Sequence, residues 1–174
     1  MSIPLRVLIA EDSEDDALLI VRELKRGGYE PTYERVTSAA GMRAALERQR
    51  WDLVIGDHSM PHFSGTAALA LVRGRGLDVP FICVSGTISE EMAVAAMRAG
   101  ANDWVTKGQL KRLIPAIERE LREAKGRAAK GTNLCNFLRR SMERRLDLDE
   151  NPYRKNECNS ESDHGTAEEQ RGSE

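Results

Sequence analysis

Five residues with reactive side chains stand directly after apolar segments of this sequence. They are Glu11, Asp12, Asp57, Ser85 and Lys107. Carboxylates that share one site repel each other unless a positive charge lies between them. Mg²⁺ prefers such hard oxygen ligands together with a phosphate oxygen, and a lysine adds a cation for an anion. An aspartate can be a covalent nucleophile toward phosphorus, and a hydroxyl can bond a phosphoryl oxygen. Together these residue types are what a phosphoryl-accepting aspartate requires.

The central member of this set, Asp57, ends a short apolar segment. Residues 53–56 carry no charge, and Pro61 follows soon after Asp57. Such a run is typical of a strand that is buried on both faces of a parallel sheet. Proline does not extend a strand, so we expect Asp57 at the carboxyl end, where open α/β sheets bind ligands. The alternative is that Asp57 only caps the following turn.

The sequence predicts five strand–helix repeats, and these residues stand at the ends of four of the predicted strands. The predicted strands are 5–10, 31–36, 53–57, 80–84 and 103–106, and the predicted helices are 14–26, 39–49, 64–72, 90–99 and 110–121. No hairpin signal separates the strands. This alternation indicates a parallel sheet with helices on both faces, connected by right-handed crossovers.

The composition changes after about residue 124. Gly126 and Gly131 interrupt the helical pattern, and residues 132–146 have the spacing of an amphipathic helix. From residue 147 onward almost no apolar residue occurs, which is typical of a disordered segment. We therefore divide the chain into a folded domain over 1–125, a linker with an amphipathic helix over 126–146 and a polar tail over 147–174.

Composition restricts the class of protein. The chain has 174 residues, 40% of them hydrophobic, and a net charge of −2, which favours a packed core and gives no sign of nucleic-acid binding. Its three cysteines form no disulfide pattern, which suggests a reducing compartment and hence the cytoplasm. We find no signal-peptide pattern and no apolar run long enough for a membrane span.

Four motifs, in this order and at these spacings, resemble the receiver domains of two-component response regulators. They are VLIAED at 7–12, DHSMP at 57–61 with Gly65 after it, VSGT at 84–87 and DWVTK at 103–107. The resemblance covers roughly residues 5–124. It implies an α/β fold of the flavodoxin-like type, a doubly wound (βα)5 unit with a parallel five-stranded sheet in the order 2-1-3-4-5, followed here by a C-terminal extension.

The resemblance also implies a magnesium site. Asp12 matches the direct Mg²⁺ ligand, and Glu11 matches the acid that acts mainly through bound water. Asp57 and the backbone carbonyl of Ser59 would complete the protein's share of the metal ligands. The alternative for Glu11 is a solvated acid beside the site.

The remaining matches concern the phosphoryl group. Asp57 matches the phosphoacceptor, Ser85 the hydroxyl that moves to the phosphoryl group, and Lys107 the cation that pairs with it. Trp104 takes the position of the family's aromatic switch residue, although it is also explained as a core residue. The sequence departs from the family pattern at Gly108, where most members have a proline.

These matches predict a signalling domain that catalyses only its own phosphorylation and dephosphorylation. The phosphoryl group would come from the phosphohistidine of a sensor histidine kinase or of a histidine phosphotransfer protein in a phosphorelay. Downstream proteins would bind a face built from the fourth helix, fifth strand and fifth helix, which corresponds to 90–98, Trp104 and 111–122. The sequence leaves homodimerisation open.

Two alternatives stay open at the level of the sequence. The chain could be a receiver-like scaffold that binds partners without phosphorylation, or an N-terminal fragment of a larger multidomain regulator. A hydrolase with an aspartyl-phosphate intermediate would need a second acid where Ser59 stands. A zinc site at His58 and His62 lacks a third ligand.

Overall fold

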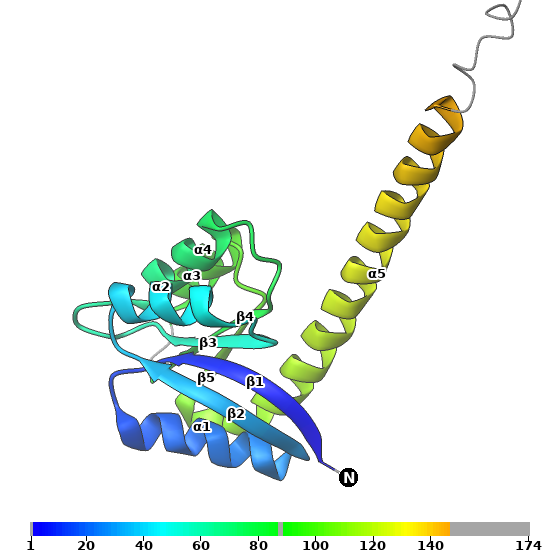
Figure 1. The fold of residues 1–174 in the computed structure, drawn as a ribbon. Coiled ribbons are helices and arrows are strands. Elements are labelled where there is room, and N and C mark those ends of the chain that lie inside the picture. The colour runs from blue at the N-terminus through cyan, green and yellow to red at the C-terminus, as the bar shows by residue number, and fades with distance from the viewer. Residues whose placement is uncertain (1, 87–88, 147–174) are drawn as a thin grey trace, which may run out of the picture. The chain divides into compact units, whose positions relative to one another are not determined.

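The computed structural model of the chain describes residues 2–86 and 89–146, and it contains a five-stranded parallel sheet in the order β2-β1-β3-β4-β5. The strands are β1 (Ile3–Ala10), β2 (Tyr29–Val36), β3 (Leu53–Asp57), β4 (Phe81–Ser85) and β5 (Asp103–Thr106). The helices are α1 (Glu14–Arg26), α2 (Ala39–Arg48), α3 (Gly65–Gly74), α4 (Glu90–Arg98) and α5 (Leu113–Leu146), and a 3₁₀ helix, η1 (Lys107–Arg112), precedes α5. The predicted doubly wound fold and its strand order are confirmed (Figure 1).

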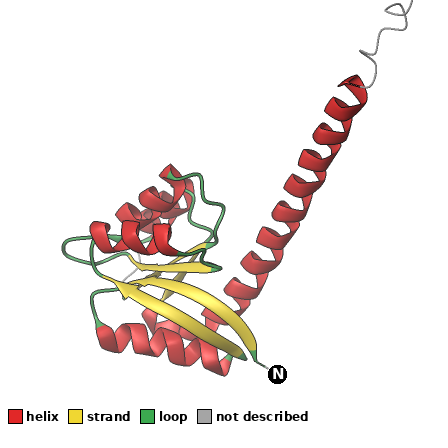
Figure 2. Cartoon of the chain, viewed as in Figure 1, coloured by secondary structure: helices red, strands yellow, loops and turns green. Residues whose placement is uncertain are grey.

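The sheet separates two hydrophobic cores, one on each face. Residues of α1 and the first turns of α5 pack on one face, and residues of α2, α3 and α4 pack on the other (Figure 2). Within β3, Leu53 and Ile55 belong to the first core and Val54 to the second. Successive side chains of a strand point to opposite faces, so a strand covered on both sides must be apolar throughout. This explains the uncharged run before Asp57.

Serine caps fix the chain after four of the strands. Ser13, Ser38, Ser64 and Ser89 each precede a helix, and each side-chain oxygen accepts a hydrogen bond from a backbone N–H of the first turn. A serine at this position satisfies an N–H group that has no partner within the helix. The caps follow the carboxyl ends of β1 to β4, so they define the loops that carry the candidate site residues.

The C-terminal part differs from the sequence expectation in two details. The last helix begins at Leu113 rather than near residue 110, because Gln109 has non-helical backbone angles of φ −131° and ψ 39°. It then continues through Gly126 and Gly131 without the expected interruption. One glycine costs a helix only about 1 kcal/mol, which does not suffice to end it.

The predicted division at 125/126 and 146/147 stays a prediction. The compact unit that carries the sheet ends at Gly131, and the predicted tail over 147–174 lies outside the described residues. Within the described ranges, none of the helices combines the length and the apolar character that a membrane crossing needs.

Candidate functional site

The candidate residues meet at one edge of the sheet because the strands end in register there. Ala10, which precedes Glu11, lies opposite Gly56, Asp57 lies opposite Val84, and Ser85 lies opposite Thr106. Four separate parts of the chain therefore deliver their polar side chains to the same place, which is the carboxyl edge where doubly wound sheets bind ligands.

Lys107 is the cation at the centre of the site. Its Nζ lies 2.8 Å from Oδ2 of Asp57, 2.5 Å from Oδ2 of Asp16 and 2.9 Å from Oε2 of Glu11. Burial lowers the pKa of Lys107, but its contacts with these three carboxylates outweigh burial and raise that pKa above its usual range. Lys107 is therefore positively charged at neutral pH.

Asp57 is held in a fixed orientation. The residue is only 5% exposed, and the backbone N–H of Ser59 donates a 2.9 Å hydrogen bond to its Oδ1. Its other oxygen, Oδ2, accepts the hydrogen bond from Lys107. The turn after Asp57 is also tied to the sheet, because the N–H of His58 donates to the carbonyl of Val84 at 3.1 Å.

Three acids of the site are close enough to share a cation. Oxygen atoms of Glu11, Asp12 and Asp57 all lie within 4.8 Å of one another. Glu11 is 1% exposed, and its Oε2 lies at ion-pair distance from Lys107 without the alignment of a hydrogen bond. A buried carboxylate oxygen that lacks a hydrogen bond, next to two further carboxylates, fits the hard oxygen ligands that Mg²⁺ prefers.

Glu11 gives the site a pH dependence. Burial raises the pKa of Glu11 to about 7, against the opposing contacts with Lys107 and the N–H of Ser13. Because this pKa lies above that of an unfolded glutamate, the folded state binds more protons between the two values. In metal-free buffer the contribution of Glu11 to the free energy of unfolding should therefore fall as the pH rises through this window.

A metal binds the ionised form of a carboxylate, so Mg²⁺ held at this acidic group would compete with the proton for Glu11. We expect Mg²⁺ to bind about tenfold more weakly at pH 6 than at pH 8, and to release a proton on binding at the lower pH. Calorimetric titration in two buffers of different ionisation enthalpy measures both effects. The Glu11→Gln variant should bind Mg²⁺ weakly at both pH values. Equal affinities at the two pH values in the unaltered protein would contradict this assignment.

Ser85 and Trp104, the two candidate switch residues, lie on neighbouring strands. Ser85 is fully buried, and its Oγ lies 3.4 Å from Oγ of Ser59. Trp104 is buried in the core formed with α2, α3 and α4, and its indole N–H has no hydrogen-bond partner among the described residues. The ring centroids of Trp104 and His58 are 5.1 Å apart.

Three contacts of the site were not predicted from the sequence. Asp16 binds Lys107, although an acid in the first turn of a helix is already explained by the helix dipole. Arg35 donates hydrogen bonds to the backbone carbonyls of Glu11 and Asp12 and so fixes the acidic loop. His58 packs against Trp104.

The family comparison identifies the domain. The family model "Response regulator receiver domain" matches residues 7–118. Sensory transduction protein RegX3 of Mycobacterium tuberculosis is 37% identical over 117 residues, which cover 67% of this chain and 50% of RegX3. Transcriptional regulatory protein RprY of Bacteroides fragilis is 29% identical over 131 residues, which cover 75% of this chain and 55% of RprY. The chain thus spans about half the length of these relatives.

Solved structures agree with this assignment. NtrX from Brucella abortus superposes with a TM-score of 0.65 at 27% identity, covering 76% of this chain and 29% of NtrX. The receiver domain of a signal transduction histidine kinase from Syntrophus aciditrophicus superposes with a TM-score of 0.58 at 27% identity, covering 68% of this chain and 91% of that domain. The fold, the motifs and the family match agree, and the chain belongs to the response regulator receiver domains of two-component systems.

Proposed function

We propose that this receiver domain accepts a phosphoryl group on Asp57. The observation that carries the proposal is the position of Asp57 itself, buried at the end of β3, bonded to Lys107 and beside Glu11 and Asp12. The donor would be the phosphohistidine of a sensor histidine kinase or of a histidine phosphotransfer protein. In both donors phosphorus is bonded to a histidine nitrogen, and this nitrogen leaves when a carboxylate attacks phosphorus.

In the transfer step, a carboxylate oxygen of Asp57 attacks phosphorus and forms a P–O bond. The P–N bond breaks, its electron pair stays on the imidazole nitrogen, and Asp57 becomes an acyl phosphate. Lys107 is placed to pair with the new phosphoryl oxygens. Mg²⁺, when held by Glu11, Asp12, Asp57 and the Ser59 carbonyl, would neutralise charge on the transferring group. Attack by water later returns the carboxylate and releases inorganic phosphate.

Phosphorylation would then change partner binding by a shift between two conformations. Ser85 lies at the end of β4 and is the hydroxyl we assign to the phosphoryl group, and Trp104 is the aromatic residue of the adjacent strand. The output face comprises α4, Trp104 of β5, the end of η1 and the start of α5 (residues 90–98, 104 and 111–122). On α4 this face exposes the apolar side chains of Val94 and Met97. A phosphoryl group that bonds better in one conformation increases the population of that conformation.

The length of the relative RprY bears on the output of the whole protein. RprY is named as a transcriptional regulator and is roughly twice as long as the matched part of this chain. A nucleic-acid partner would therefore belong to a region that RprY has beyond its receiver domain. For the present chain, whose net charge is −2, we propose protein partners.

The test is phosphate uptake by the purified chain. Incubation with acetyl phosphate and Mg²⁺ should add the mass of one phosphoryl group, as measured by intact-protein mass spectrometry. Asp57→Asn should abolish the gain, and so should chelation of Mg²⁺. Asp15→Asn, which removes an exposed acid of α1, should leave it unchanged. A folded chain that gains no mass under any condition would favour the scaffold that binds partners without phosphorylation.

A further inference from the structure

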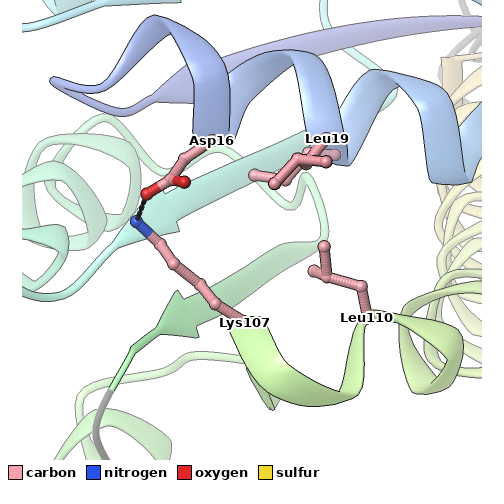
Figure 3. Close-up of a pocket in the computed structure, with 5 residues that line it drawn as sticks. Asp16, Leu19, Lys107 and Leu110 are labelled. Carbon is pink, nitrogen blue, oxygen red and sulfur yellow. Dashed lines mark hydrogen bonds and ion pairs between the residues drawn. The ribbon is translucent and has the colours of Figure 1, made fainter.

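Asp16 lies outside the residues of the reacting centre, yet it binds the lysine of that centre. It belongs to the first turn of α1, and its Oδ2 accepts a 2.5 Å hydrogen bond from Nζ of Lys107. Figure 3 shows the two side chains pointing toward each other from α1 and from the segment after β5. We infer that Asp16 is a positioning residue, which holds the ammonium group of Lys107 beside Asp57 during phosphoryl transfer. This inference rests on the function proposed above.

The backbone of Asp16 is held in place by the helix cap and by the packing of α1. The backbone N–H of Asp16 donates to the capping oxygen of Ser13 at 3.3 Å, which fixes the residue in the helical turn. The next residues along the buried side of α1, Ala17 and Ile20, are each only 1% exposed and pack in the core of that face. The backbone of Asp16 is therefore held by α1, so its carboxylate offers the ammonium group of Lys107 a partner that is attached to the helix.

Lys107, in contrast, has little support from its own backbone. Gly108 follows it directly and is exposed, and a Cβ added to Gly108 would meet no atom within 4 Å. Gln109 has non-helical backbone angles inside η1. Lys107 lines a small pocket together with Leu19, Ile20 and Leu110, whose apolar side chains offer no partner to its charged end. The position of the ammonium group is thus decided by its carboxylate partners.

Asp16 differs in its part in the reaction from Glu11 and Asp57, the other two carboxylates that contact Lys107. Glu11 and Asp57 both belong to the acidic group that can hold a metal, and Asp57 itself becomes an acyl phosphate. Asp16 is not a member of this acidic group and forms no bond to phosphorus. An ammonium group has three N–H donors, so Lys107 can keep one on Asp16 and direct another to the phosphoryl oxygens.

Four proteins test this inference: the unaltered chain, Asp16→Ala, Asp16→Glu and Asp15→Ala as a matched control. Asp15 is the preceding acid of the same turn and is exposed, so both alanine variants lose one carboxylate from the helix start. We expect Asp16→Ala to take up phosphate from acetyl phosphate about threefold to tenfold more slowly, because the lost contact is charged but partly solvated. Asp15→Ala and Asp16→Glu should stay within about twofold of the unaltered rate.

The same comparison in a Lys107→Met background shows whether Asp16 acts through the lysine. There the Asp16→Ala substitution should have no further effect on the rate. Equal rates for Asp16→Ala and Asp15→Ala, or a loss that persists unchanged without Lys107, would overturn the role of Asp16. An unaltered chain that takes up no phosphate would instead overturn the proposed function, so the two failures are distinguishable.

Discussion

Replacing Lys107 with Met should lower the free energy of unfolding by about 2–3 kcal/mol in metal-free buffer at pH 8. The variant leaves Glu11, Asp16 and Asp57 without their shared cation, and two of these carboxylates are at most 5% exposed. Removing one partner of a fully buried ion pair costs about 3–5 kcal/mol, and the 22% exposure of the Lys107 side chain reduces that cost. Phosphate uptake should fall as well, because no cation remains to pair with the phosphoryl oxygens.

Urea unfolding followed by tryptophan fluorescence measures the stability loss. Mg²⁺ should restore more stability to Lys107→Met than to the unaltered chain, because it binds the carboxylates that have lost their partner. Lys111→Met is the matched control, since Lys111 lies on the same 3₁₀ helix and is exposed. Equal unfolding free energies for the two variants would show that Lys107 does not neutralise the acidic group.

Replacing Gly65 with Ala should disturb the phosphoacceptor without changing any reactive group. A Cβ on Gly65 would lie 2.8 Å from the carbonyl oxygen of Asp57 and 3.2 Å from Cα of His58. Both are backbone atoms, so the end of β3 or the start of α3 has to shift. We expect a stability loss of about 1–3 kcal/mol, despite the better helix propensity of alanine. The displacement also separates Asp57 from Lys107, which should slow phosphate uptake by about tenfold or more.

Gly74→Ala is the matched control for Gly65→Ala. Gly74 is the last residue of the same helix, and an added Cβ would meet no atom within 4 Å. This substitution should be neutral or stabilise the protein by up to about 1 kcal/mol. Thermal unfolding and the rate of phosphate uptake compare the two variants. If both behave alike, the close approach of α3 to the Asp57 backbone does not position the site.

The sequence predicted the fold because local signals agree along the whole domain. Buried strands such as 53–57 carry no charge until their last residue, Asp57, and Ser13, Ser38, Ser64 and Ser89 stand where helices begin. Because the carboxyl ends of parallel strands meet at one edge of the sheet, the strand pattern also predicts that Glu11, Asp57 and Lys107 lie close together. The strand order came from the family resemblance, because alternating strands and helices alone allow several orders.

The contacts that the sequence did not predict are tertiary. Asp16 meets Lys107 only because α1 and the segment after β5 cover the same face of the sheet. His58 meets Trp104 because β3 and β5 flank β4 and their ends lie close together. Neither pair has a periodicity or a spacing that marks it, and an acid at a helix start has an explanation of its own. Such contacts can be predicted only after the strand order is known.

The most direct test of this account is to locate the phosphoryl group on the chain. After incubation with acetyl phosphate and Mg²⁺, borohydride reduces an aspartyl phosphate to homoserine, and peptide mass spectrometry identifies the reduced position. We predict homoserine at position 57 alone, and none in Asp57→Asn or without Mg²⁺. Reduction at Asp12 or Asp16, phosphate retained on His58, or a folded chain without any modification would contradict the assignment of Asp57 as the phosphoacceptor.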